Sequence, residues 1–289
     1  MVFLKKHFFY IVFFILITSS CKKEDEEEIT PPRDVGEQAI QDEQSLEDFL
    51  SNHFYNYEEF KNLNNQTKIL FDTISGENSD KIPLIDQVLK SSISVKTSDG
   101  SFVSHPIYTL VAREGIGQSP SSVDSTYVSY EGLLLNKSSF DSSITPVWFD
   151  LTSVVRGFRE GIPALKPGDF SVDENNVPIF SNYGQGAIFM PSGLGYFGNA
   201  AGSIPAYSPI IFKIDLFLVK QTDHDGDGIL SALEFDNDGD GISDDLDPND
   251  EDGPLGDLDG DGVPNNQDLD DNNPNIGTTT SDNDGDGIS

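Results

Sequence analysis

Residues 154–161 read Val154-Val155-Arg156-Gly157-Phe158-Arg159-Glu160-Gly161, and this stretch decides the fold. Its apolar side chains continue at helical spacing as far as Leu165, which predicts a short helix with one apolar face. Lys166-Pro167-Gly168 ends the pattern, because proline does not continue a helix. On both sides the apolar residues recur with a period of two, which is typical of strands. The expected strands contain Phe102, 107–111, 126–130, 133–135, 187–190 and 210–219. The order of these elements along the chain, with strands before and after one short helix, predicts an antiparallel α+β domain.

Five further motifs flank this helix in a fixed order. They are Tyr130-Glu131-Gly132, Phe140-Asp141-Ser142-Ser143, Met190-Pro191-Ser192-Gly193-Leu194-Gly195-Tyr196, Gly202-Ser203-Ile204-Pro205 and Ile211-Phe212-Lys213-Ile214-Asp215-Leu216. The ordered set resembles the FKBP-type peptidyl-prolyl cis-trans isomerases. This resemblance implies an FKBP-like antiparallel sheet wrapped around a short helix, which we expect over residues 101–220.

The resemblance also implies a catalytic pocket lined by aromatic and aliphatic side chains. Its residues are Tyr130, Phe140, Asp141, Val154, Val155, Phe158, Tyr196, Ile204 and Phe212. We expect Asp141 to be a buried carboxylate that faces the reacting carbonyl group, and Tyr196 to donate its hydroxyl to a substrate carbonyl. For the apolar members the alternative role is plain core packing. Phe158 stands where the most active members carry tryptophan, and residues 147–149 should supply a second aromatic wall, without the sequence showing which residue does so.

These residue types suit prolyl isomerisation. Rotation about a prolyl amide meets a barrier of ~18–20 kcal/mol, because resonance holds the C–N bond planar. The cis and trans forms differ by only about 0.5–1 kcal/mol, so a catalyst has to change the rate alone. A dry aromatic pocket that holds the twisted amide better than the planar one suffices, without a nucleophile or a cofactor. The expected substrates are proline-containing client polypeptides. The alternative is a non-catalytic, calcium-dependent surface binding or structural protein that uses a degenerate pocket.

Residues 169–185 read as an insertion between the helix and the next strand. We expect its aromatic residues Phe170, Phe180 and Tyr183 either to cover the pocket or to extend it towards a client.

The first 20 residues predict a secretory signal peptide. Lys5 and Lys6 precede an apolar stretch at 8–17, which is too short to span a bilayer, since a spanning helix needs about 20 residues. The only cysteine, Cys21, follows three small residues, as in bacterial lipoprotein signals, where that cysteine is lipidated. The resemblance implies secretion across the inner membrane and a lipid anchor in the outer membrane, on its periplasmic or surface-exposed side. An ordinary signal peptide with an incidental cysteine is the alternative.

Residues 21–33 form an acidic tether, whose run KKEDEEE resembles the surface-export signals of Bacteroidetes lipoproteins or serves simply as a solvated spacer. An N-terminal extension follows at 34–100. Its residues 34–54 predict a helix with one largely apolar face, which should pack on another element. The remainder of the extension carries no pattern that indicates a role.

The last region, 221–289, repeats the unit Asp-x-Asp-Gly-Asp-Gly-Ile/Val four times. Carboxylates at positions 1, 3 and 5 with glycine at position 6 are typical of a Ca²⁺ loop, because hard oxygens converge where glycine permits a sharp turn. The candidate ligands are Asp223, Asp225, Asp227, Ile229 through its carbonyl, Ser231, Glu234, Asp236, Asp238, Asp240, Asp247, Asp257, Asp259, Asp261 and Asp268.

Since only Phe235 separates the first two units, helix–loop–helix pairs do not fit between them, and the region instead resembles thrombospondin type 3-like repeats. His224 occupies a non-ligand position and is expected to face solvent. A disordered acidic spacer is the alternative.

The formal net charge of −33 excludes one class of partner. Residues 223–289 contain 22 acidic residues and no lysine or arginine, so much of the charge belongs to the repeats. Such a surface repels polyphosphates, which excludes nucleic acid as a partner.

The run 193–198 matches G-x-G-x-x-G, the form of a dinucleotide-binding motif. That motif requires a helix to begin at its end, but residues 199–205 contain glycine and proline and do not open a helix, so we expect no nucleotide to bind.

Overall fold

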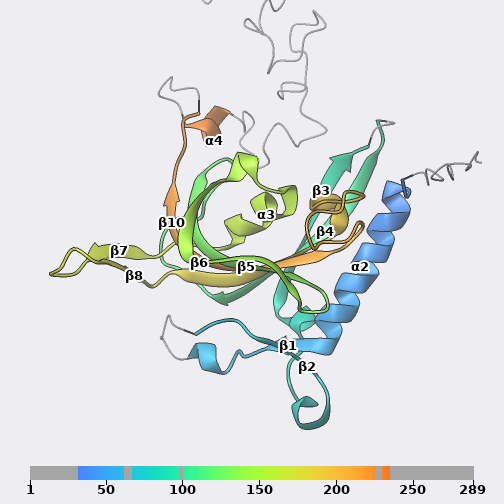
Figure 1. Ribbon diagram of the computed structural model, residues 1–289, viewed down its shortest axis with the longest axis horizontal. Coiled ribbons are helices and arrows are strands. Elements are labelled where there is room, and N and C mark those ends of the chain that lie inside the picture. Colours follow the sequence, from blue (N-terminus) through green and yellow to red (C-terminus); the bar gives the residue numbers. More distant parts are fainter. Residues whose placement is uncertain (1–31, 62–66, 98–99, 225–229, 235–289) are drawn as a thin grey trace, which may run out of the picture. The chain divides into compact units, whose positions relative to one another are not determined.

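A six-stranded antiparallel sheet organises the computed structural model, which describes residues 32–61, 67–97, 100–224 and 230–234 (Figure 1). The strands are β3 (Val88–Lys96), β4 (Phe102–Arg113), β5 (Ser125–Leu134), β6 (Ser139–Asp150), β9 (Gly184–Met190) and β10 (Ile210–Lys220). Their order across the sheet is β3-β4-β9-β10-β5-β6, and each neighbouring pair is antiparallel. The predicted antiparallel α+β architecture is therefore confirmed.

The short helix α3 (Arg156–Gly161) covers one face of this sheet (Figure 1). The 3₁₀ turns η5 (Leu151–Ser153) and η6 (Ile162–Ala164) flank it, so the helical stretch expected at 154–165 consists of α3 followed by a 3₁₀ turn. Phe158 and Ile162 are buried against alternate residues of β9 and β10. Gly161 permits this close approach, because a Cβ there would lie 2.6 Å from the Ile188 side chain.

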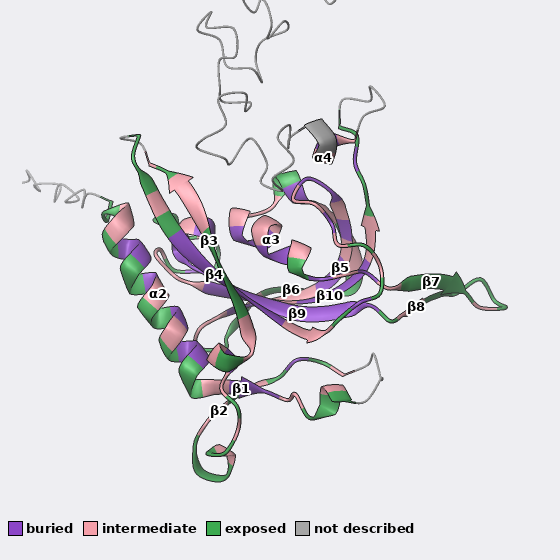
Figure 2. Cartoon of the chain, turned by 180° about the vertical axis from the view of Figure 1, so that it is seen from behind, coloured by how far each residue is buried: buried purple, intermediate pink, exposed green. Residues whose placement is uncertain are grey.

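Helix α2 (Val35–Asn52) covers the opposite face, as Figure 2 shows by its buried stripe. Asp34 caps its first turn by accepting a 2.9 Å hydrogen bond from the backbone N of Glu37. Leu46, Phe49 and Leu50 are buried in a cluster that includes residues of β4, β9 and β10. The predicted helix and its docking are confirmed. It ends two residues earlier than expected, because the next residues form strand β1 (His53–Tyr55), which pairs with β2 (Phe71–Thr73).

Two strands of the sheet had no sequence prediction. Strand β3 lies inside the expected extension at 34–100, yet it pairs with β4 over nine residues, so the sheet begins before the expected domain boundary at 101. Strand β6 lies at the other end of the sheet, next to β5 alone. Both are end strands whose residues are mostly exposed or half-buried, and the alternation of apolar and polar residues is correspondingly weak.

The predicted insertion forms a hairpin of β7 (Asp169–Val172) and β8 (Pro178–Ser181), which projects away from the sheet (Figure 1). The remaining short helices are η2 (Glu59–Lys61), η3 (Gly76–Asn78), η4 (Leu84–Asp86), η7 (Ser192–Leu194) and α4 (Ser231–Glu234). Within the described ranges no helix has the length and apolar character that crossing a membrane requires. The predictions for the signal peptide, Cys21 and the repeats from Asp236 onward lie outside the described residues.

Candidate active site

Five aromatic rings on four elements form a connected cluster on the α3 face of the sheet. They belong to Tyr130 on β5, Phe140 and Phe149 on β6, Phe158 on α3 and Phe212 on β10. The ring centroid of Phe158 lies 5.8 Å from that of Phe149 and 5.3 Å from that of Phe212, and both pairs meet edge to face. Tyr130 lies 5.3 Å from Phe149 and 6.1 Å from Phe212, which closes the circle. The two contacts of Tyr130 are tilted, and the edge-to-face contacts of Phe158 have a geometry that pairs of aromatic rings prefer.

Phe158 forms the floor of this aromatic pocket. Its side chain is only 2% exposed, and the edge-on rings of Phe149 and Phe212 stand against it. Phe140 adds a further ring, 5.6 Å from Phe212. The structure thus brings the predicted aromatic residues together.

Phe149 is the second aromatic wall that the sequence left open among residues 147–149. Because side chains alternate along a strand, its neighbour Trp148 points to the other side of β6. There Trp148 contacts Tyr127 at 5.1 Å, and it is 48% exposed. The spacing alone did not reveal this choice, because β6 is irregular between its pairings to Val128 and Tyr130.

Asp141 is at the rim of the pocket, where the Tyr130 hydroxyl donates a 2.6 Å hydrogen bond to its Oδ2 atom. The prediction of a buried carboxylate was wrong, because Asp141 is exposed on an end strand of the sheet. Burial, the Asp141 carboxylate and the nearby Tyr196 together raise the pKa of Tyr130 to about 12. The Tyr130 hydroxyl therefore stays protonated at neutral pH.

The segment between η7 and β10 supplies Tyr196 and Ile204. Ile204 is 4% exposed and forms an isolated antiparallel bridge with Ala201, which fixes its position in the segment. Tyr196 is half-buried against the same core cluster. Both predicted residues therefore lie with the aromatic pocket.

Val154 and Val155 lie between η5 and α3 and are half-buried against the pocket core. Asp150 caps the turn η5 that precedes the two valines. Its Oδ1 atom accepts hydrogen bonds from the backbone N (3.0 Å) and the hydroxyl (2.7 Å) of Thr152. Val155 precedes the helix, and its carbonyl accepts a 2.9 Å bond from the backbone N of Phe158. The valines are thus placed by the turn that also positions the pocket floor.

The N-terminal extension supports the pocket segment through Asp42 on α2. This buried carboxylate accepts hydrogen bonds from Ser192 and from Gln38. Burial raises the pKa of Asp42, and the hydrogen bonds oppose that rise. Ser192 opens η7, the turn that leads into Tyr196. The sequence did not predict this role. The signal was Asp42 itself, an acidic residue on the otherwise apolar face of the predicted helix, where a buried carboxylate needs hydrogen-bond donors.

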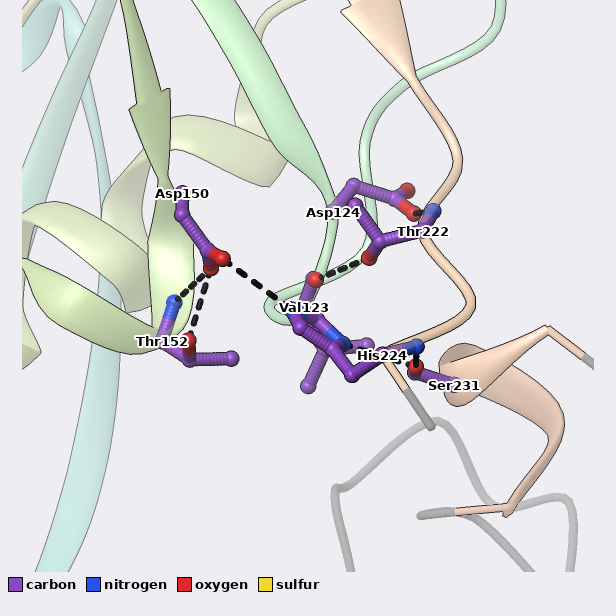
Figure 3. A network of polar contacts seen from close by, with 7 residues as sticks. All are labelled: Val123, Asp124, Asp150, Thr152, Thr222, His224 and Ser231. Carbon is purple, nitrogen blue, oxygen red and sulfur yellow. Dashed lines mark hydrogen bonds and ion pairs between the residues drawn. The ribbon is translucent and has the colours of Figure 1, made fainter. Parts of the chain in front are cut away.

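A polar network joins the start of the acidic repeats to the end of β6 (Figure 3). His224 Nε2 lies 3.1 Å from Asp150 Oδ2, and His224 Nδ1 lies 2.8 Å from the Ser231 hydroxyl. The backbone N of Ser231 donates to the Thr222 carbonyl at 2.9 Å, and Thr222 N donates to the buried Asp124. His224 is exposed, as expected, and its ring also contacts Asp150 and Ser231. Its pairing partner Asp150 is separated from it by 74 positions, a contact that the repeat pattern could not show.

Of the predicted calcium ligands, the structure describes the surroundings of Asp223 and Ser231. The Ser231 hydroxyl is engaged by His224, and Ser231 is fully buried. Among the described residues no cluster of three or more His, Cys, Asp or Glu side chains is placed to hold a metal ion. Asp225, Asp227 and Ile229 lie outside the described residues, so the metal prediction remains a prediction.

A cavity of about 310 Å³ is lined by residues of β5, β6 and β10, among them Tyr130, and by Lys68 and Ile69. Its charged lining residues pair with one another, Lys68 with Asp215 and Lys213 with Glu131. Lys213 also donates to the Ile69 carbonyl at 3.1 Å. These contacts attach the segment around residues 67–69 to the sheet.

The fold and the pocket define a class: an α+β domain with an aromatic pocket, a hydroxyl–carboxylate pair at its rim and a short helix as its floor. Residues 117–217 match the family model of the FKBP-type peptidyl-prolyl cis-trans isomerases, so this part of the chain is similar to an FKBP-type isomerase domain. The matched range includes all nine pocket residues that the sequence predicted.

Two curated relatives carry peptidyl-prolyl cis-trans isomerase in their names. The FKBP-type peptidyl-prolyl cis-trans isomerase FkpA of Aeromonas hydrophila is 32% identical over 120 residues, which cover 40% of this chain and 39% of the relative. The peptidyl-prolyl cis-trans isomerase Mip of Coxiella burnetii is 36% identical over 114 residues, covering 38% of this chain and 44% of the relative. The chain thus spans less than half the length of these two relatives. A solved isomerase from Pseudomonas syringae is 26% identical and superposes with a TM-score of 0.34, over 44% of this chain and 81% of that one.

Proposed function

We propose that the whole protein acts as a peptidyl-prolyl cis-trans isomerase on proline-containing client polypeptides. The observation that carries this proposal is the closed circle of rings around Phe158, within the range that matches the isomerase family. An apolar floor and aromatic walls suit the pyrrolidine ring of proline, and they exclude water from the amide. As the amide twists it loses its resonance, and a dry pocket favours that less polar state over the planar one.

The residues at the rim have separate roles in this mechanism. Tyr130 and Asp141 form one hydrogen-bonded unit, which keeps the carboxylate beside the pocket mouth. We propose that this carboxylate lies near the carbonyl of the residue before proline, and that Tyr196 donates its hydroxyl to a substrate carbonyl. These contacts would orient the peptide so that rotation occurs about one bond, which is the positioning that catalysis of this reaction needs.

A prolyl-tetrapeptide isomerisation assay tests this function. Wild type should accelerate isomerisation, and Asp141→Ala should reduce kcat/KM by about tenfold, the size of losing one charge-assisted contact. Tyr130→Phe keeps the ring and removes only the hydroxyl, so it should reduce kcat/KM less than Asp141→Ala. Ser142→Ala, an exposed neighbour on the same strand, is the matched control and should leave the rate unchanged. No acceleration by the wild type would reject the enzyme and favour the non-catalytic binding protein.

We further propose that the protein works outside the cytoplasm, attached through a lipid on Cys21, and assists folding of cell-envelope or surface proteins. The signal-like residues 1–20 and the position of the only cysteine support this location. Metabolic labelling with a palmitate analogue tests it: the wild-type chain should incorporate label, and Cys21→Ser should not. A labelled Cys21→Ser chain would contradict the anchor.

We also propose that the Asp-rich units bind Ca²⁺. In the first unit the donors would be the carboxylates of Asp223, Asp225, Asp227 and Glu234, with the Ile229 carbonyl, an all-oxygen set that suits this ion. Ser231 would contribute only if its hydroxyl could serve both the ion and His224, because the two groups already share a 2.8 Å contact. No step of the isomerisation requires the metal.

A further inference from the structure

The projecting hairpin carries an apolar strip that runs back to the sheet. We define the hairpin strip as Trp148, Tyr127, Phe180, Phe170 and Val172. Its aromatic rings contact one another in series, with centroid distances of 5.1 Å (Trp148–Tyr127), 5.8 Å (Tyr127–Phe180) and 5.5 Å (Phe180–Phe170). Trp148 is 48% exposed, and Phe170 and Val172 are each 53% exposed. Tyr127 and Phe180 between them are half-buried, and exposed large apolar side chains that lie together in this way indicate an interaction surface.

The strip occupies one face of the hairpin. Phe170 pairs with Phe180 and Val172 with Pro178, so these four side chains point to the same side. The opposite side carries Asp169, Ser171, Ile179 and Ser181 in the alternate positions. Figure 2 shows β7 as exposed along its length.

Local contacts hold the hairpin in this form. At its tip the Asp173 carboxylate accepts 2.8 Å hydrogen bonds from the backbone N of Asn175 and of Val177. At its base Gly168 N donates to the Phe217 carbonyl at 3.1 Å, and the Phe180 ring lies 5.1 Å from that of Phe217. The exposed apolar side chains therefore stand on a braced element, which lowers the entropy cost of binding to them.

The strip meets the aromatic pocket at strand β6. Trp148 ends the strip on one face of β6, and the next residue, Phe149, is a wall of the pocket on the other face. Because β6 lies at the end of the sheet, no described strand continues beyond it. A polypeptide whose prolyl bond occupied the pocket would extend about 3.3 Å per residue, so a few residues past the proline would reach over β6 to Trp148.

Charge distinguishes between the possible occupants of the strip. The hairpin carries Asp169, Asp173 and Glu174 and no basic residue. The acidic segment 223–289 of the same chain would be repelled, and so would a second copy with a net charge of −33. An apolar segment with neutral or basic residues fits both the rings and the surrounding carboxylates.

We propose that the hairpin strip binds an apolar, neutral or basic segment of the same unfolded client whose prolyl bond lies in the pocket. This inference rests on the proposed isomerase function and adds a second contact to it. The strip then acts only on substrates long enough to reach from the pocket across β6, and a tetrapeptide does not use it.

Two substrates test the proposal with the full chain. One is a prolyl tetrapeptide; the other is ribonuclease A, unfolded in guanidinium with its disulfides intact, a basic protein with proline-limited refolding phases. Phe170→Ser with Val172→Ser should lower kcat/KM for ribonuclease A about tenfold, as expected for removing central apolar contacts, and leave the tetrapeptide value within about twofold. Ile179→Ser, the same kind of change on the opposite face of the hairpin, is the matched control and should change neither value.

The outcomes separate the two proposals. If the wild type does not act on the tetrapeptide, the isomerase function fails. If it does, and the double variant matches the wild type on ribonuclease A, the strip proposal is overturned. Equal losses on both substrates would also overturn it, because the hairpin would then support the pocket itself. Sedimentation gives a further check: a wild-type dimer that the double variant abolishes would assign the strip to a second copy instead.

Discussion

The Asp42 carboxylate accepts two hydrogen bonds from Ser192, one from the backbone N at 2.7 Å and one from the hydroxyl at 2.6 Å. These residues lie 150 positions apart, on the N-terminal helix α2 and on the turn that leads into the pocket segment. Both are buried, so neither donor has water as a substitute partner. The extension is therefore part of the structure that positions Tyr196 and Ile204.

Removing this carboxylate should destabilise the fold. We expect Asp42→Ala to lower the free energy of unfolding by about 2–4 kcal/mol, because three buried donors, two on Ser192 and one on Gln38, lose their acceptor. Urea unfolding followed by far-UV circular dichroism measures this change. Asp48→Ala, on the exposed side of the same helix, is the control and should stay within about 0.5 kcal/mol of wild type. An equal effect of the two changes would mean that Asp42 does not hold the turn.

The opposite orientations of Trp148 and Phe149 give a second prediction. Phe149→Leu removes an aromatic wall that contacts Tyr130 and Phe158, so kcat/KM for the tetrapeptide should fall about tenfold. Trp148→Leu changes the neighbouring ring on the other face and should leave the tetrapeptide rate within about twofold of wild type. If Trp148→Leu were the more damaging change for this substrate, the assignment of the wall to Phe149 would be incorrect.

Stability should fall as the solution becomes mildly acidic, partly through His105 on β4. Its side chain is 1% exposed, and neither ring nitrogen has a hydrogen-bond partner among the described residues. Burial, together with the Arg156 guanidinium, lowers the pKa of His105 below its ordinary value of 6.5. The unfolded chain then takes up a proton below about pH 6.5 while the folded chain does not, so its contribution to stability is complete above that pH and is lost as the pH falls towards the folded pKa.

Unfolding by urea at several pH values between 5.5 and 7.5 measures this dependence. His105→Leu should flatten the profile by up to about 1.4 kcal/mol per pH unit, the slope for one proton. Burial lowers the pKa of His53 as well, so a smaller dependence should remain in that variant. A His105→Leu profile as steep as that of wild type would show that His105 does not titrate in this way.

Calcium binding should be measurable on the full chain and should not be needed for catalysis. Calorimetric titration of the chelator-treated protein should show several bound Ca²⁺ ions per chain, and Asp225→Asn with Asp227→Asn should remove one of them. The tetrapeptide rate should be the same with Ca²⁺ and with chelator, because the pocket residues lie at 130–212, before the first unit. Asp86→Asn, outside the repeats, controls for a general charge effect. Absence of heat on titration would favour the disordered acidic spacer.

His224 allows the link between the repeats and the domain to be tested separately. His224→Ala removes the ring contacts to Asp150 and Ser231 but no proposed ligand, and it keeps the hydrogen bond from the backbone N of residue 224 to Ser231. The number of bound ions should therefore be unchanged, while limited proteolysis near residue 222 should become faster because the segment opens more often. Unchanged proteolysis would show that Thr222 and Asp124 hold the segment alone.

The sequence by itself determined the residue types of the pocket and their order along the chain, and the resemblance to the FKBP-type isomerases grouped them into one expected site. It also determined helix α2 and its docking, since one face of residues 35–50 is largely apolar. Only the tertiary structure decided that Phe149 rather than Trp148 faces the pocket, because an irregularity in strand pairing sets the facing of each residue. It likewise decided that Asp141 is exposed, that Asp42 reaches Ser192 and that His224 reaches Asp150. Each of these depends on which segments the fold brings together across long stretches of chain, and local periodicity carries no information about such pairings.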